Sequence, residues 1–337
     1  MTDHDPGSRE WLDQVKEEII DPEREIVDPH HHLWQRIRWF RYMLEDLWTD
    51  TGCGHNVRKT VFVQCRSSYR TEGPEHLKPV GETEFVAQIA KESQEGSEDQ
   101  ARIAGIVSYA NLTLGDLVEE ILDAHEEAGR GLFRGIRHPG ALDENRNALM
   151  IPGLGEKDLF AREDFRQGVR MLGHRGLTYE SWHYHHQIKS FTDLARAAPD
   201  TVIILDHFGT PLGVGPYAGK RNEIFQEWKK DIAELAKCKN VYAKLGGMAM
   251  PDNGFSWHLR SVPPTSDEFV NAQKDYYLHT IECFGPDRCM FESNYPVDRL
   301  SISYHVLWNG FKKIVAEFLE DEKDMMFSGT ATRVYNL

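Results

Sequence analysis

The sequence has few cysteines, and none of them forms a recognisable pair. Five cysteines are scattered over 337 residues, and no Cys-x-x-Cys spacing occurs. Because a zinc ribbon or a disulfide scaffold needs paired or clustered cysteines, neither is expected. Scattered single thiols are typical of a reducing compartment, and we therefore expect a cytoplasmic location.

Long apolar runs and an excess of positive charge are also lacking. No apolar stretch approaches the roughly 18–20 residues that span a bilayer, and the first residues lack a signal-peptide pattern, so no membrane partner is expected. Lys and Arg total 39 against 54 Asp and Glu, a net charge of −15. Such an acidic chain repels a phosphate backbone, so no nucleic-acid partner is expected. The expected partner is a small molecule, and a homo-oligomer stays open.

Eight short apolar runs rich in β-branched residues alternate with amphipathic helical patterns. The expected strands are Glu25–His30, Thr60–Cys65, Arg102–Tyr109, Leu132–Arg137, Gly176–Trp182, Thr201–Asp206, Asn240–Leu245 and Arg288–Glu292. Strands that alternate with helices pair in parallel through right-handed crossovers. Eight such units predict a closed (β/α)8 TIM barrel, in preference to a doubly wound open sheet.

The predicted barrel occupies residues 24–337 as one domain, after an N-terminal extension at 1–23. Two long segments interrupt the alternation of strands and helices, at 34–56 after the first strand and at 250–264 after the seventh. Both follow the C-terminal ends of strands, where such a barrel builds its active site.

Aromatic side chains are concentrated in the first of these long segments. It contains Trp34, Trp39, Phe40, Tyr42 and Trp48. This spacing predicts an aromatic lid, either as packing or as a wall for the substrate. Tyr42, together with Trp182 after the fifth strand, is a candidate for that substrate wall.

Sixteen histidines are the most unusual part of the composition, and several stand at the ends of predicted strands. Side chains alternate along a strand, so His30 and His32 share one face and His31 points the other way. Two imidazoles at this spacing can hold one metal ion. His186 follows the fifth strand and His207 closes the sixth, which brings histidine to the same rim from three strand ends.

Five motifs in chain order carry a family resemblance: DPHHHLW, FRGIRHPG, WHYHHQ, ILDHFGTP and FESNYPVD. Together they resemble the amidohydrolase superfamily, and in particular its amidohydrolase-related branch. That branch contains sugar-acid lactonases, pyrone-dicarboxylate lactonases and metal-dependent decarboxylases. The resemblance covers about residues 24–337 and implies a (β/α)8 barrel, in agreement with the strand count.

The resemblance also implies roles for individual residues. His30, His32 and His186 would bind one divalent metal ion, zinc before others, or form a metal-free electrophilic site. His207 would lie near the reacting group. Arg137 would clamp a substrate carboxylate, which a guanidinium matches with two hydrogen bonds; a salt bridge at the rim is the alternative.

One position departs from the family pattern, which has Ser-Asp-x-Pro after the eighth strand. Asn294 stands where the Asp is expected, and an amide cannot accept the proton of an attacking water. Glu292, Asp298 and His207 are the candidate replacements for that base. Lys244, at the end of the seventh strand, would hold a substrate anion or form an ion pair, for which Glu292 is a possible partner.

Taken together, these features predict a hydrolase of a small carboxylated substrate, most directly a lactone opened by water at a histidine-rich rim. Two alternatives stay open. One is a metal-dependent, non-oxidative decarboxylase, and the other is a catalytically silent binding protein on the same barrel.

Overall fold

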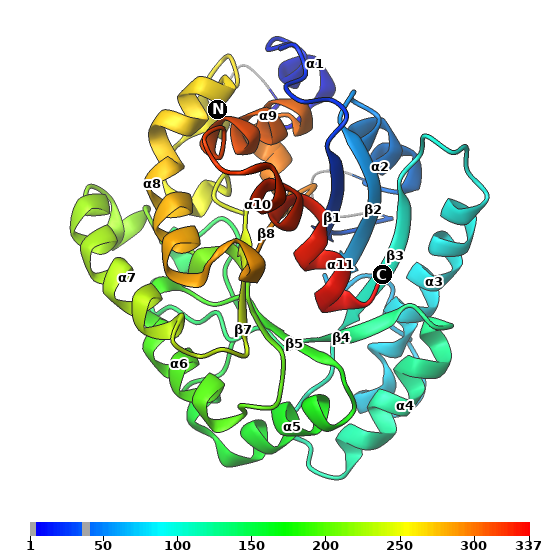
Figure 1. The fold of residues 1–337 in the computed structure, drawn as a ribbon. Helices are drawn as coiled ribbons and strands as arrows, with labels where there is room; N and C mark the ends of the chain where they lie inside the picture. The colour runs from blue at the N-terminus through cyan, green and yellow to red at the C-terminus, as the bar shows by residue number, and fades with distance from the viewer. Residues whose placement is uncertain (1–4, 36–40) are drawn as a thin grey trace.

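The fold is a barrel of eight parallel strands with helices between them (Figure 1). The computed structural model describes residues 5–35 and 41–337. Each strand pairs in parallel with the next along the chain, in the order β1 to β8. This confirms the (β/α)8 fold class predicted from the alternating pattern.

All eight predicted strands are present, with ends that differ by a few residues. The strands are β1 (Glu25–His31), β2 (Asn56–Val63), β3 (Arg102–Ser108), β4 (Phe133–Arg137), β5 (Thr178–Ser181), β6 (Ile203–Leu205), β7 (Val241–Leu245) and β8 (Cys289–Phe291). Most of their side chains are buried, because helices cover the outside of the sheet and side chains fill its inside.

At least one helix follows each strand and packs on the outside of the barrel. The helices are α1 (Arg9–Leu12), α2 (Leu44–Thr51), α3 (Val80–Gln94), α4 (Leu117–Gly129), α5 (Glu163–His174), α6 (Ile188–Ala197), α7 (Arg221–Leu235), α8 (Ser266–Phe284), α9 (Tyr304–Ile314), α10 (Glu320–Asp324) and α11 (Thr330–Tyr335). The longest, α8, begins with a capping box in which Thr265 and Glu268 each accept a hydrogen bond from the other's backbone N–H.

A side chain joins the first and last strands. The carboxylate of Asp28 accepts hydrogen bonds from the Ser293 backbone N–H at 2.9 Å and the Tyr304 hydroxyl at 2.9 Å. Just beyond, the His32 N–H donates to the Tyr295 carbonyl at 2.8 Å. Burial raises the pKa of Asp28 to about 6. The barrel is therefore closed by a buried carboxyl group together with one backbone contact.

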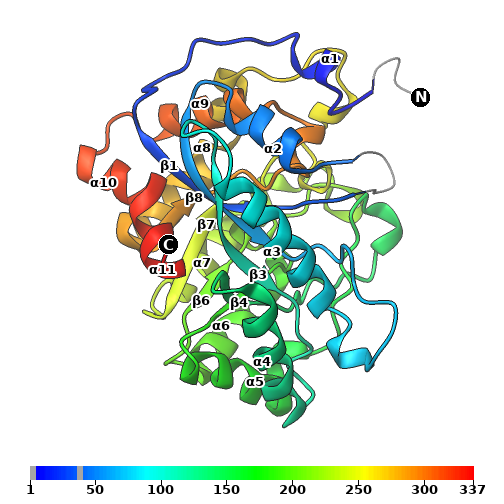
Figure 2. The same ribbon diagram turned by 90° about the vertical axis from the view of Figure 1, so that its right-hand side faces the viewer.

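The C-terminal helices close the lower end of the barrel, which is the end at which the strands begin. These helices are at the left of Figure 2, opposite the loops that follow the strands. Ala331 and Tyr335 of α11 pack with apolar side chains that point into the barrel, among them Val27, Val61 and Met290. The hydroxyl of Tyr335 reaches further in and donates a hydrogen bond to Glu180 on β5. The polar groups inside the barrel therefore extend down to its lower end, where Tyr335 contacts Glu180.

The N-terminal segment lies against α8, α9 and the loop before α8. The Trp11 indole donates to the Arg260 carbonyl at 3.0 Å, and Lys312 on α9 donates to the carbonyls of Ile20 and Asp21 at 2.9 and 2.7 Å. The division of the chain into an extension at 1–23 and a barrel stays a prediction.

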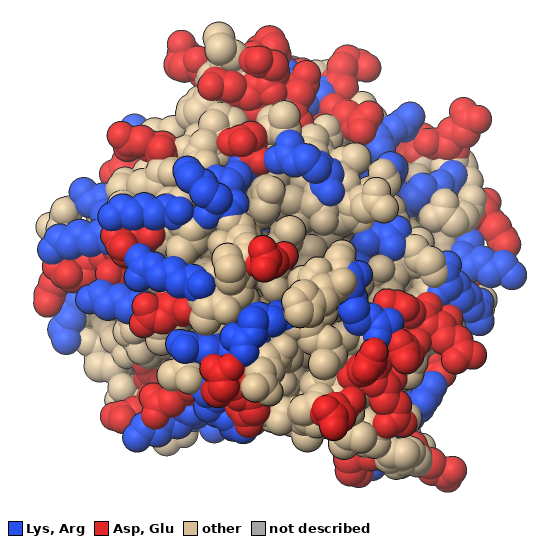
Figure 3. Space-filling view, turned by 60° about the horizontal axis from the view of Figure 1, so that its bottom comes forward, with Lys and Arg blue, Asp and Glu red and all other residues tan. Residues whose placement is uncertain are grey.

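The two long segments both stand at the rim that follows the strands. The first contains α2, and its Trp39 and Phe40 lie outside the described residues. The second contains two 3₁₀ turns, Pro251–Asn253 and Trp257–Leu259. Within residues 5–35 and 41–337, no helix combines the length and the apolar character that crossing a bilayer requires. On the face shown in Figure 3, acidic and basic side chains are interspersed.

Candidate active site

A cavity of about 320 Å³ opens at the rim formed by the C-terminal ends of the strands. Polar groups line part of it: His32, Gln64, Arg66, Arg137, His207 and Asn294. Apolar side chains line another part: Trp34, Met150, Ile151, Leu154, Trp182 and Met250. A concave site of this kind, mostly apolar with a few converging polar groups, is typical of a small-molecule site.

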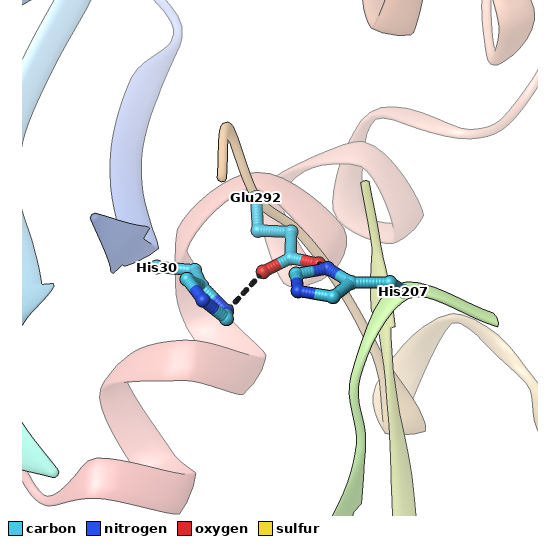
Figure 4. Close-up of side chains that lie close together, drawn as sticks. All are labelled: His30, His207 and Glu292. Atoms are coloured by element: carbon cyan, nitrogen blue, oxygen red, sulfur yellow. Dashed lines mark hydrogen bonds and ion pairs between the residues drawn. The ribbon is translucent and has the colours of Figure 1, made fainter. Parts of the chain in front are cut away.

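The carboxylate of Glu292 lies between two imidazoles (Figure 4). One oxygen is 2.6 Å from Nδ1 of His30 on β1, and the other is 2.6 Å from Nδ1 of His207, which follows β6. Glu292 and His30 are fully buried, and His207 is 2% exposed and lines the cavity. Burial would lower the pKa of His207, but the carboxylate of Glu292 outweighs it and raises that pKa above its usual value.

Two glycines make room for this contact. A Cβ on Gly247 would lie 2.2 Å from Nδ1 of His207, and a Cβ on Gly246 would lie 2.1 Å from the carbonyl oxygen of Glu292. Gly247 also has φ of +71°, a conformation that other residues adopt at a cost. His207 and Phe208 have φ of +52° and +58°, and such strain in non-glycine residues is concentrated at functional sites.

Two cations lie on either side of His30. Arg137, at the end of β4, places Nη1 3.2 Å from Nε2 of His30, and Lys244 on β7 places Nζ 3.3 Å from its Nδ1. Burial, followed by the charge of Lys244, lowers the pKa of His30 well below its usual value. His30 is therefore a neutral imidazole with both ring nitrogens engaged.

Beneath His30, Lys244 forms a buried ion pair with Glu180 at 2.7 Å and lies 3.5 Å from Asp206. Asp206 is also 3.5 Å from Arg137. Burial would raise the pKa of Asp206, but Lys244 and the other nearby cations outweigh it and lower that pKa. Lys244 thus forms an ion pair, with Glu180 as its partner instead of Glu292, and its role toward a substrate anion stays a prediction.

His31, the last residue of β1, and His32, which follows it, point to opposite sides, as predicted from the sequence. His32 lines the cavity, and its Nδ1 is 2.7 Å from the Val63 carbonyl. His31 points outward and packs edge-on against Phe62 at 5.9 Å. Burial lowers the pKa of His31 to about 3, so it is a neutral core residue.

Asn294 and Asp298 form a pair next to the cavity. Asn294 lines the cavity and donates a hydrogen bond to Asp298 at 2.9 Å, and Asp298 also accepts from the Ala249 N–H at 3.1 Å. Burial raises the pKa of Asp298 to about 7. Asp298 is fully buried behind Asn294, where it positions the loops after β7 and β8.

Two of the predicted site residues lie away from this group. His186 is in a separate surface depression, 3.8 Å from Asp143 and stacked on Tyr217, so the structure does not bring it to His30 and His32 as the resemblance implied. Tyr42 is fully buried and donates to Asp50 at 2.9 Å, so it supports the first long segment. Trp182 does line the cavity wall.

The buried donors satisfy the spacing of a metal site in two overlapping sets. His30, His207 and Glu292 each offer one ligand atom within 4.8 Å of the others, and so do His30, Glu180 and Asp206. Neither set is the predicted trio of His30, His32 and His186.

Comparison with known proteins decides the family. Residues 27–337 match the profile of a family described as Amidohydrolase. The chain belongs to this family. It is therefore an enzyme, a hydrolase of the amidohydrolase family, and the resemblance seen in the motifs is confirmed.

This amidohydrolase has relatives that it matches nearly from end to end. An uncharacterised Sinorhizobium fredii protein, y4mH, is 30% identical over 93% of this chain and 98% of its own length. An L-fucono-1,5-lactonase of Burkholderia multivorans is 24% identical, over 92% and 96%. Among solved structures, a zinc-bound amidohydrolase from Burkholderia multivorans matches with a TM-score of 0.71 and 21% identity, over 93% and 99%.

Several side chains in and below the site of this amidohydrolase were not predicted from the sequence. Glu180 and Asp206 lie inside two predicted strands, and their inward position follows from side-chain alternation once the register is known. Gln64 and Arg66 follow β2, where polar residues at a strand end were the available signal. The glycine pair 246–247 also ends a strand, and a pair of glycines there indicates a close approach of other groups.

Proposed function

We propose that this amidohydrolase hydrolyses a lactone, with the Glu292–His207 pair activating water and Arg137 polarising the carbonyl group. The observation that carries the proposal is the 2.6 Å contact of Glu292 with Nδ1 of His207 at the base of the cavity. A carboxylate on one ring nitrogen orients a histidine and stabilises its protonated form, which is the arrangement of an activated general base.

The first step is attack by water. Because Nδ1 of His207 faces Glu292, Nε2 is the ring nitrogen that accepts a proton from the water. The water oxygen bonds to the lactone carbonyl carbon, and the electron pair of the carbonyl bond moves to its oxygen. Glu292 stabilises the imidazolium that forms on His207.

In this proposal Arg137 stabilises the negative oxygen. Its guanidinium lines the cavity, donates to the Gln64 carbonyl, and keeps a buried Nε–H without a partner among the described residues. A fixed cation aimed at developing charge is one of the strongest catalytic contributions in a dry site. We therefore assign Arg137 to the reacting carbonyl, next to His30, in place of the substrate-carboxylate clamp expected from the sequence.

Collapse of the tetrahedral intermediate completes the reaction. The bond between the carbonyl carbon and the ring oxygen breaks, and the ring oxygen takes the proton from Nε2 of His207. The product is an open hydroxy acid, and His207 returns to its neutral form for the next turnover.

The donor positions suit a metal ion, whereas the charge around them does not. His30, His207 and Glu292 are close enough to bind one, and a bound divalent ion would act as a Lewis acid. However, Arg137 and Lys244 already contact both ring nitrogens of His30. A cation at His30 would have to displace one of them, so no step of the proposal uses a metal ion. The expectation of zinc stays a prediction.

The similarity to an L-fucono-1,5-lactonase over nearly the whole chain supports a lactone as the substrate. At 24% identity this similarity supports the type of bond that is cleaved, and not a particular sugar lactone.

A panel of lactones tests the proposal in a pH-stat at neutral pH. Lactone hydrolysis releases a proton as the new carboxylic acid ionises, whereas decarboxylation consumes one and releases carbon dioxide. We expect proton release that falls at least about 100-fold in the His207→Gln variant. The matched control is His186→Gln, the same change at a histidine outside the cavity, which should keep wild-type activity. Proton uptake, or full activity in His207→Gln, would refute the proposal.

A further inference from the structure

Arg66 is a cation at the cavity that the proposed reaction does not use. It follows β2, lines the cavity and is exposed to solvent. No ion pair joins it to a carboxylate in the part of the chain that the structure describes. By contrast, Arg70, four residues later, is paired with Glu84. An arginine that faces a binding cavity and has no carboxylate partner is available to a ligand.

The turn that contains Arg66 has an unfavourable backbone conformation. Arg66 has φ of +61°, the left-handed region that a residue with a side chain adopts only when its surroundings hold it there. Those surroundings are provided by Glu82 on α3, which is 1% exposed. One of its oxygens accepts hydrogen bonds from the backbone N–H groups of Cys65 at 3.1 Å and Ser67 at 2.6 Å.

These hydrogen bonds hold the residues immediately before and after Arg66. On the other side, Arg137 binds the Gln64 carbonyl. Three backbone groups around Arg66 are therefore held in place: the carbonyl of Gln64 and the N–H groups of Cys65 and Ser67. The backbone at Arg66 is therefore held in one conformation beside the cavity.

The apolar wall of the cavity is fixed in a similar way. The chain from Met150 to Leu154 lines it. The buried carboxylate of Asp252 accepts hydrogen bonds from the Met150 N–H at 2.7 Å and the Ile151 N–H at 2.9 Å. Leu154 remains 52% exposed, although it is a large apolar side chain. An apolar surface that is held rigid and left open beside a cavity is suited to a hydrocarbon part of a ligand.

We propose that Arg66 determines specificity by binding a carboxylate of the substrate, while the wall at 150–154 takes a hydrocarbon part of the same molecule. This rests on the proposed function and extends it. Arg137 is committed to the reacting carbonyl, so a carboxylate elsewhere on the substrate needs a second cation, which Arg66 supplies. The substrate class is then an amphipathic, carboxylated lactone, in contrast to a polyhydroxylated sugar lactone.

Three probes separate these features: dihydrocoumarin, dihydrocoumarin with a carboxylate on its benzene ring, and gluconolactone. We expect the carboxylated compound to have the highest kcat/KM and gluconolactone the lowest. Arg66→Ala should lower kcat/KM, through KM, by about 10- to 100-fold more for the carboxylated compound than for dihydrocoumarin, because a hydrogen bond to a charged group is lost. Arg66→Lys should restore part of that difference, and Arg70→Ala should not produce it.

The apolar wall is tested with Leu154→Ser. Because residue 154 is exposed, this change should leave the fold intact, and a loss of kcat/KM then reports on the wall. The two dihydrocoumarins should lose several-fold in kcat/KM relative to gluconolactone. Equal effects of Arg66→Ala on the charged and uncharged compounds, or a preference for gluconolactone, would overturn the inference.

Failure of the proposed function gives a different result from failure of this inference. If wild-type protein opens none of the lactones, calorimetry with the lactam analogue of the carboxylated dihydrocoumarin still measures binding. Weaker binding by Arg66→Ala would then support the carboxylate site without lactonase activity. Unchanged binding by this variant would refute the site.

Discussion

Two fully buried glutamates inside the same barrel have opposite kinds of partner. Glu180, on β5, is bound by the ammonium of Lys244 and the hydroxyl of Tyr335 from α11. Glu292, just after β8, lies between the imidazoles of His30 and His207. The partners of Glu180 are an ammonium group and a phenol hydroxyl that donates to it. The partners of Glu292 include His207, and an imidazole is the side chain most often used for proton transfer. The lower glutamate is therefore suited to holding the barrel together, and the upper one to chemistry.

The largest expected effect concerns the upper glutamate. Glu292→Gln keeps the shape of the side chain but removes the charge that stabilises protonated His207. We expect kcat toward the best lactone to fall by about 100- to 10,000-fold, with little change in thermal stability. Steady-state kinetics and a melting curve measure the two quantities on one preparation. Retained activity would remove Glu292 from the mechanism and erase the distinction from Glu180.

The lower glutamate should show the reverse pattern. Glu180→Gln leaves Lys244 without its 2.7 Å partner in the barrel interior. Removing one member of a buried ion pair typically costs about 3–5 kcal/mol, so the free energy of unfolding should fall by that amount. Urea titration measures it, with the exposed Glu163→Gln as control. A loss below about 1 kcal/mol would show that Glu180 does not hold the barrel as proposed.

A third buried glutamate, Glu82, belongs to neither class, because its partners are backbone N–H groups. Burial raises its pKa to about 7 from the usual 4.5. The folded state thus binds a proton more tightly than the unfolded state, and folding becomes less favourable as pH rises through this window. Between pH 4.5 and pH 8, wild type should lose about 3 kcal/mol relative to Glu82→Gln. Urea titrations at both pH values give the difference, and parallel pH profiles of the two proteins would contradict it.

The smallest expected effect is that of chelation. If Arg137 and Lys244 provide the positive charge at His30, dialysis against EDTA should change kcat by less than about two-fold. Elemental analysis of the same sample reports how much metal was removed. A stoichiometric metal ion whose loss abolishes activity, and whose return restores it, would make the upper cluster a metal site.

Much of the barrel could be predicted because each strand is a short apolar run bounded by turn signals. His30, His32 and His207 were identifiable for the same reason, since they end such runs. His186 was not placed correctly, because β5 ends at Ser181 and the chain then turns away through a 3₁₀ turn. Side-chain alternation applies only within a strand, so it carries no information across that turn.

The sequence indicates that charged side chains are buried, but it does not indicate which of them pair with one another. Glu292 and Lys244 are inward positions on neighbouring strands, which made a pair between them reasonable. Glu180 takes Lys244 instead, at 2.7 Å, and thereby leaves Glu292 to the histidines. That choice depends on which side chains meet across the interior, together with a hydroxyl from α11, and local sequence patterns do not contain it.

The position of α11 has a practical consequence for immobilising the enzyme. Tyr335 and Leu337 pack with the apolar side chains inside the lower end of the barrel. The C-terminus lies on the side of the barrel opposite the loops that follow the strands (Figure 2). A linker joined behind Leu337 therefore leaves the molecule away from the opening that substrates use. Coupling to a solid support through that end should preserve catalytic turnover, provided the linker does not pull Tyr335 from its contact with Glu180.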